Sequence, residues 1–104
     1  MEPLYDENGI TVYNGDCRLI MPNLSPVDLV LTDPLYGETS FQWDRRVSGW
    51  IQLLPVKPET SMWCFGSLRS FMESEFPGWH LAQDVIWEKH NGIRHLNGIG
   101  CEIQ

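Results

Sequence analysis

An apolar run of strand length that ends abruptly in Asp-Pro constrains this chain more than any other feature. Residues 27–31 are Val-Asp-Leu-Val-Leu, and Thr32-Asp33-Pro34-Leu35-Tyr36-Gly37 follows directly. The run predicts a buried strand, and the proline and glycine after it predict a sharp turn. Such a strand would deliver the Asp33 carboxylate and the Tyr36 ring to the carboxyl edge of a sheet, where open α/β sheets place their ligands.

The segment before this run predicts the first unit of a parallel sheet. A polar lead ends in the turn signal Asn8-Gly9, and residues 10–13 have strand composition. Asp16 is a good N-cap for a short helix over residues 17–21. The order strand, helix, strand predicts a right-handed crossover between parallel strands.

The rest of the chain predicts two more helices and two more strands. Asp44 would cap a helix with one apolar face, residues 61–65 predict a third parallel strand, and Ser67 would cap the next helix. Residues 79–88 predict a fourth strand. The two apolar helix faces comprise Val47, Trp50, Ile51 and Leu54, and then Leu68, Phe71, Met72 and Phe76. The predicted fold is therefore α/β, a small mostly parallel sheet with flanking helices.

Composition bounds the class of protein. A chain of 104 residues forms at most one small domain, and most of its five tryptophans are expected in a core or an interface. The net charge of −7 argues against strong autonomous DNA binding. The cysteines and histidines show neither metal-ligand spacing nor a disulfide framework, and no apolar run is long enough to span a bilayer. A cytoplasmic protein without a metal or a membrane partner is expected.

Two carboxylates are candidates for one site. Asp16 and Asp33 each follow a predicted strand, and neighbouring parallel strands bring such residues to the same edge of a sheet. Each has a simpler explanation, since Asp16 can cap a helix and an Asp-Pro pair can form a turn. The joint pattern favours a shared pocket.

The Asp33-Pro34-Leu35-Tyr36 stretch resembles the Asp-Pro-Pro-Tyr motif of the amino-group DNA methyltransferases, which methylate adenine N6 or cytosine N4 with S-adenosylmethionine. Methylation of an exocyclic amine needs a flipped base, a ring to stack on it and acceptors for its amino hydrogens. The resemblance implies that Asp33 and the Pro34 carbonyl are the acceptors and that Tyr36 is the stacking ring. It also implies that Asp16 lies near the cofactor's adenine. Leu35 stands where the family has its second proline.

The resemblance covers about residues 10–92 and is to phage-type enzymes whose catalytic motif comes first in a permuted order. It implies half of a Rossmann-like methyltransferase domain over 1–92, followed by an irregular, divergent tail over 93–104. In that order the glycine-rich cofactor loop would lie beyond this chain. No cofactor is therefore expected to bind the chain alone, although the family uses S-adenosylmethionine.

Truncation and acidity together favour a non-catalytic binding protein. An acidic domain can occupy a basic nucleic-acid channel in another protein, so the expected partner is a nucleic-acid-handling host defence complex, inhibited in the manner of an anti-CRISPR or anti-restriction protein. Glu73 and Glu75, on the polar face of the predicted third helix, are candidate partner-binding residues. A homodimer is also possible on this pattern. The alternatives are half of a split methyltransferase that needs a second chain, and a decaying gene product without function.

Overall fold

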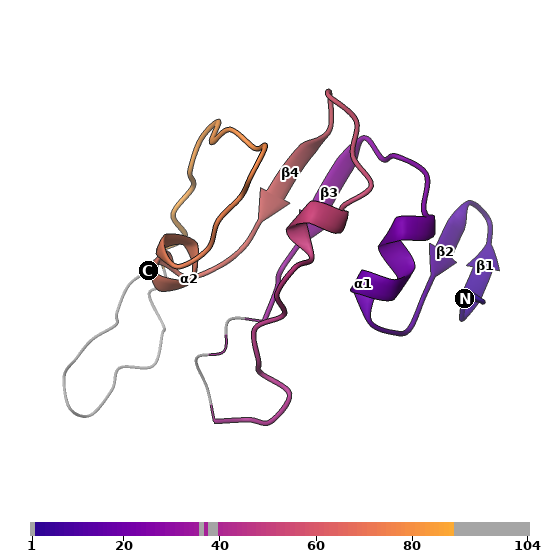
Figure 1. Cartoon of the computed structure of the whole chain (residues 1–104), viewed down its shortest axis with the longest axis horizontal. Helices are drawn as coiled ribbons and strands as arrows, with labels where there is room; N and C mark the ends of the chain where they lie inside the picture. Colours follow the sequence, from indigo (N-terminus) through magenta and orange to yellow (C-terminus); the bar gives the residue numbers. More distant parts are fainter. Residues whose placement is uncertain (1, 36, 38–39, 89–104) are drawn as a thin grey trace. The chain divides into compact units, whose positions relative to one another are not determined.

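Residues 2–35, 37 and 40–88 are described by the structure, a computed structural model, and they fall in two units, 1–65 and 66–104 (Figure 1). The described residues form a small mixed α/β structure with two short sheets, one an antiparallel pair and one a parallel pair. The predicted α/β class is therefore confirmed at this coarse level. The predicted single, mostly parallel sheet is not what the described residues form.

An antiparallel hairpin opens the first unit. Strand β1 (Tyr5–Glu7) pairs with β2 (Ile10–Val12), with Tyr5 opposite Val12. Asn8 and Gly9 both have positive φ, 55° and 78°, which is the backbone of the type I′ turn that suits a two-residue hairpin. The turn prediction is confirmed, but the strand before it was missed. The prediction that residues 10–13 join the parallel sheet is wrong, because this tight turn folds them back onto their immediate neighbours.

A short helix follows the hairpin, as predicted. Helix α1 spans Cys17–Ile20 with Asp16 as its N-cap, and the 3-10 turn η1 (Met21–Asn23) continues it. Pro22 lies in the first turn of η1, where its missing N–H costs nothing. Ile20 is the one buried hydrophobic side chain among the described residues, with 7% of its surface exposed.

The apolar run forms a strand, and its partner is the strand predicted at residues 61–65. Strand β3 (Leu29–Thr32) pairs in parallel with β4 (Ser61–Cys64), in the register Leu29 to Ser61 and Thr32 to Cys64. Backbone bonds extend the pairing at both ends, from Ser61 N–H to the Asp28 carbonyl at 3.2 Å and from Phe65 N–H to the Thr32 carbonyl at 2.9 Å. This pairing confirms the predicted parallel relation of the two strands.

The connection between these strands is less regular than predicted. The 3-10 turn η2 (Ile51–Leu53) is the single element in the described part of residues 33–60, so the helix expected from Asp44 to Leu54 does not form. Gly49, with φ of 77°, interrupts the segment, and Pro55 ends it. The apolar spacing of Trp50, Ile51 and Leu54 therefore supports one turn of helix and no more.

The second unit contains a single short helix among its described residues. Helix α2 (Leu68–Met72) begins at Ser67, whose hydroxyl accepts the Ser70 N–H at 3.1 Å, as predicted. Its predicted apolar face is largely open, with Leu68 and Met72 exposed, and the ring centroids of Phe71 and Phe76 lie 6.4 Å apart. The prediction of a strand at 79–88 is wrong, because those residues have no regular structure. Trp79 is half-buried, and all the others, including Val85-Ile86-Trp87, are exposed.

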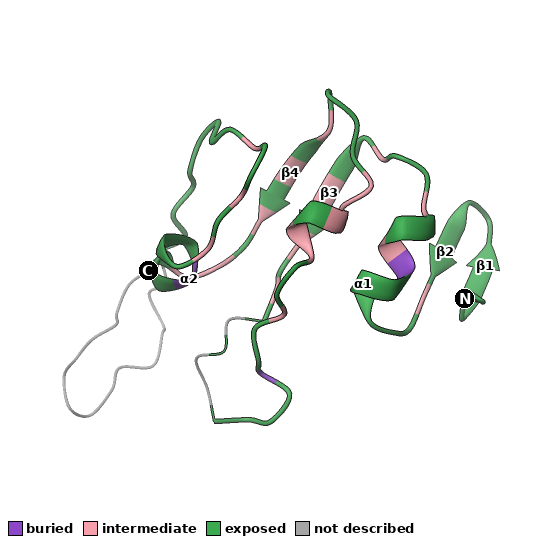
Figure 2. Cartoon of the chain, in the orientation of Figure 1, coloured by how far each residue is buried: buried purple, intermediate pink, exposed green. Residues whose placement is uncertain are grey.

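Few apolar side chains are buried in the described residues (Figure 2). The tryptophans do not form a buried core in this part of the chain, since Trp43, Trp63 and Trp87 are exposed and Trp50 and Trp79 are half-buried, so their expected place in an interface stays a prediction. The β3–β4 pair shows how the exposure arises. Its side chains alternate, and one side is half-buried while the other is open to solvent. We call the open side the exposed sheet face; its apolar members are Leu29, Leu31, Trp63 and Phe65.

We expect this exposed sheet face to drive self-association or tight binding to another chain, because a contiguous apolar surface beside open strand edges is prone to association. Replacing Leu31 and Trp63 by serine is expected to reduce apolar-dye binding and to shift the protein toward monomer in light scattering. Burying a large aliphatic side chain contributes about 1.5–3 kcal/mol, so association weakens roughly tenfold or more.

Leu19→Ser is the matched control, since Leu19 is 66% exposed on α1 and lies outside the exposed sheet face. Equal effects of the control and of the double variant would contradict a specific role for this face. A monomer at high concentration without dye binding would contradict the expectation altogether.

Candidate functional site

Asp33 lies at the carboxyl edge of the parallel pair, directly after the last residue of β3. Its side chain is exposed and Pro34 is half-buried. On the partner strand, Cys64 lies opposite Thr32, and its thiol pKa is raised first by burial and further by the nearby charge of Asp33. The sequence therefore predicted the position of this carboxylate correctly. Tyr36, the expected stacking ring, lies outside the described residues.

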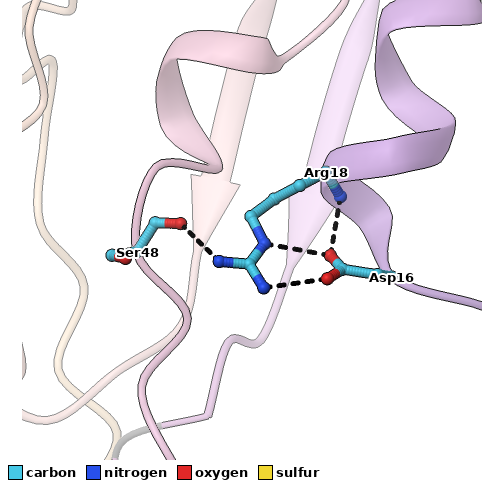
Figure 3. Close-up of polar contacts among 3 residues, drawn as sticks. All are labelled: Asp16, Arg18 and Ser48. Carbon is cyan, nitrogen blue, oxygen red and sulfur yellow. Dashed lines mark hydrogen bonds and ion pairs between the residues drawn. The ribbon is translucent and has the colours of Figure 1, made fainter.

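Asp16 is held by Arg18 in a two-pronged ion pair (Figure 3). The Arg18 guanidinium donates from Nε to Oδ1 at 3.0 Å and from Nη2 to Oδ2 at 2.8 Å, and the Arg18 backbone N–H also donates to Oδ1 at 2.9 Å. The remaining arm of the guanidinium, Nη1, donates to the Ser48 carbonyl at 3.3 Å. One carboxylate thus caps α1 and, through Arg18, holds the backbone near residue 48.

This pairing changes the expectation for Asp16. The shared pocket with Asp33 depended on β2 lying beside β3, and β2 pairs with β1 instead. The structure supports the simpler explanation, in which Asp16 is the N-cap of α1. The sequence carried the signal that was missed: an arginine two residues after an N-cap aspartate can reach back to it.

Asp44 holds the loop that follows the Asp33 motif. Its carboxylate accepts the Gly37 N–H at 2.9 Å, and its own N–H donates to the Phe41 carbonyl at 3.1 Å. Only 8% of Asp44 is exposed, which is unusual for a carboxylate. Gly37 has a φ of 72°, and a Cβ on it would come within 3.2 Å of the Arg46 side chain. Asp44 is therefore a loop clamp and not the helix cap predicted from the sequence.

An aromatic pair stands beside this clamp. The rings of Phe41 and Trp43 stack with their centroids 5.4 Å apart and their planes 12° from parallel, and 59% and 64% of the two residues are exposed. Phe41 was not singled out from the sequence. Phe41 lines a surface hollow of about 470 Å³. The hollow is lined by Gly37, Ser40, Phe41, Asp44, Arg45 and Arg46.

The candidate partner-binding glutamates lie at the end of α2. Glu73 is its C-cap and Glu75 follows beyond it, so the two do not share the polar face of one helix as predicted. Both are exposed. No group of three or more His, Cys, Asp or Glu side chains within the described ranges is placed to hold a metal ion.

Comparison of the chain with protein-family models, with curated proteins and with solved structures gave no match. Among the described residues, no helix has the length and apolar character needed to cross a membrane.

The Asp16–Arg18 pair gives a pH-dependent prediction. The side-chain hydrogen bonds from Arg18, followed by its backbone N–H, lower the pKa of Asp16 to about 2. An aspartate whose pKa falls on folding stabilises the fold above its unfolded pKa of about 3.9, and that contribution is lost as the pH falls toward 2. Carboxyl NMR titration of wild type and of Arg18→Ala should show the Asp16 pKa rising toward its ordinary value in the variant.

Arg69→Ala is the matched control, because Arg69 is an exposed arginine of α2 in the other unit. This control should leave the Asp16 titration unchanged. An unchanged Asp16 titration in Arg18→Ala would show that the ion pair does not form in solution.

Proposed function

We propose that this chain is a non-catalytic, acidic binding protein derived from a phage-type DNA methyltransferase, and that it inhibits a nucleic-acid-handling host defence complex of the CRISPR or restriction kind. The observation that carries the proposal is the exposure of its carboxylates. Of those in the described residues, only Asp44 is buried, and the whole chain has a net charge of −7. Such a surface is attracted to channels that bind phosphates and is repelled by DNA itself.

Exposed acids occur in both units. The hairpin carries Asp6 and Glu7 on β1, and the sequence contains no lysine or arginine before Arg18. In the second unit, residues 66–88 include four carboxylates and one arginine, Arg69. Negative side chains spaced along a folded chain can take the places of successive phosphates in a basic groove.

The state of Asp16 supports the non-catalytic character. The resemblance to methyltransferases implies that the Asp16 carboxylate lies near the cofactor's adenine. In this structure both of its oxygens accept hydrogen bonds from Arg18. Releasing it would cost those charge-assisted bonds, which are among the stronger hydrogen bonds in proteins. The same pair also holds the Ser48 backbone, so the carboxylate has a structural task.

A second candidate is half of a split amino-methyltransferase whose partner chain supplies the cofactor loop. The position of Asp33 favours it, because this carboxylate follows β3 at the edge of a parallel pair, as the acceptor carboxylate of this class would. On this alternative, Asp33 is required for function. On the inhibitor proposal, Asp33 is dispensable.

We expect Glu73→Lys combined with Glu75→Lys to weaken binding to the target complex about tenfold or more, since like charges would then meet in the groove. A lysine near the carboxyl end of α2 suits the helix dipole, so the fold is retained. Affinity measured by competition against labelled DNA or RNA should fall as salt rises, because charge attraction is screened over about 10 Å at 0.1 M.

Asp33→Ala is the discriminating variant for this experiment. Inhibition that survives Asp33→Ala and fails with the charge reversals supports the proposal. Inhibition that fails with Asp33→Ala and survives the charge reversals would show instead that the methyltransferase-like edge is the functional part.

S-adenosylmethionine is expected to bind the isolated chain very weakly, because the one carboxylate assigned to it is engaged by Arg18. Titration calorimetry measures this directly, with Arg18→Ala as a comparison that frees Asp16. A micromolar dissociation constant for the wild-type chain would contradict the non-catalytic proposal and favour the split enzyme.

A further inference from the structure

The hollow beside the Asp44 clamp combines the two groups that recognise a nucleotide. Phe41 offers an exposed ring within the hollow, and Arg45 offers an exposed guanidinium that lines the same space. A nucleotide has a flat base that stacks on aromatic rings and a phosphate that pairs with arginine. A volume of about 470 Å³ lies within the range of small-ligand sites.

The ring of Phe41 is held in place before any ligand arrives. Trp43 stacks on it at 5.4 Å without itself lining the hollow, so Trp43 is a backing ring. The Phe41 carbonyl accepts the Asp44 N–H, and the Arg45 N–H donates to the Trp43 carbonyl at 3.1 Å. These bonds fix the backbone on both sides of the aromatic pair, which reduces the entropy lost when a base stacks.

The charges of the hollow favour an anion although the chain as a whole is acidic. Two of the five described lysine and arginine residues, Arg45 and Arg46, line it. Among the lining residues that the structure describes, Asp44 is the one carboxylate, and it is buried and accepts the Gly37 N–H. The described lining of the hollow therefore carries more positive than negative charge.

We propose that this hollow binds a nucleotide, with the base stacked on Phe41 and the phosphate paired with Arg45. The proposal does not rest on the inhibitor function, because it uses different residues from the exposed carboxylates. A free nucleotide and one unit of a single strand share this chemistry. A duplex does not, since its bases are stacked inside.

The test titrates the full chain with AMP and, separately, with a labelled single-stranded DNA decamer and the matching duplex. Binding is followed by amide NMR shifts at Gly37 and Arg45 and by fluorescence anisotropy. Phe41→Ala is expected to weaken binding of AMP or of the decamer about tenfold, the usual loss for one base stacked on an aromatic ring. Arg45→Ala is expected to weaken it and to flatten its salt dependence.

Phe41→Tyr keeps the ring and should keep the affinity, which separates loss of stacking from loss of fold. Trp87→Ala and Arg69→Ala are matched controls, because both residues are exposed and neither lines the hollow. Equal affinity for AMP and for one site on the decamer assigns the hollow to a free nucleotide, whereas much tighter binding of the decamer assigns it to a single strand.

Three outcomes overturn the proposal. The first is the absence of any shift at Gly37 or Arg45 with either ligand at millimolar concentration. The second is an equal loss of affinity in Phe41→Tyr and Phe41→Ala. The third is an equal loss in the two matched controls.

Discussion

The parallel pairing of β3 with β4 is the interaction on which the first unit depends. It joins segments that are far apart in the sequence, and side-chain and backbone bonds secure its entry end. The Thr60 hydroxyl donates to the Val27 carbonyl at 2.6 Å, and the Val27 N–H donates to the Pro55 carbonyl at 2.9 Å. Because both strands run in the same direction, the pairing places Asp33 and Cys64 at one edge and requires the chain between them to return to the start of β4.

The described residues of the loop after Asp33 differ in charge from the acidic stretches of the chain. Carboxylates are exposed on the hairpin and beyond α2, while the loop after Asp33 combines an aromatic ring with two arginines around a buried acid. Local geometry therefore matters more than net charge for what each surface can attract. An acidic chain can carry one site suited to an anion, provided that its nearest carboxylate is engaged by a backbone N–H, as Asp44 is by Gly37.

The sequence predicted turns and helix caps correctly, whereas it predicted the pairing of distant strands only in part. Asn8-Gly9, Asp16 and Ser67 each specify a turn or a cap through their own backbone and side-chain bonds, and each was predicted correctly. Strand pairing depends on competition between segments, so β2 could not be assigned to β1 from composition alone.

The expected helix after Asp44 failed for a related reason. Apolar spacing predicts which face would be buried, and the described residues offer that face little to pack against. In the candidate site, the position of Asp33 followed from the strand and the turn after it. The Asp44 clamp and the Arg18 pair could not be foreseen, because they depend on which side chain meets which backbone group.

Loop-closure entropy has a consequence for how the segment at 33–60 can evolve. Its ends are fixed by the β3–β4 pairing, and the cost of closing a flexible connection grows only with the logarithm of its length, by about 0.6 kcal/mol for each doubling. Insertions in this segment, away from Pro55 and Thr60, are expected to leave the pairing nearly as stable as before. Phe41, Arg45 and Arg46 thus lie in the part of the first unit where changes that create a binding surface destabilise the fold least.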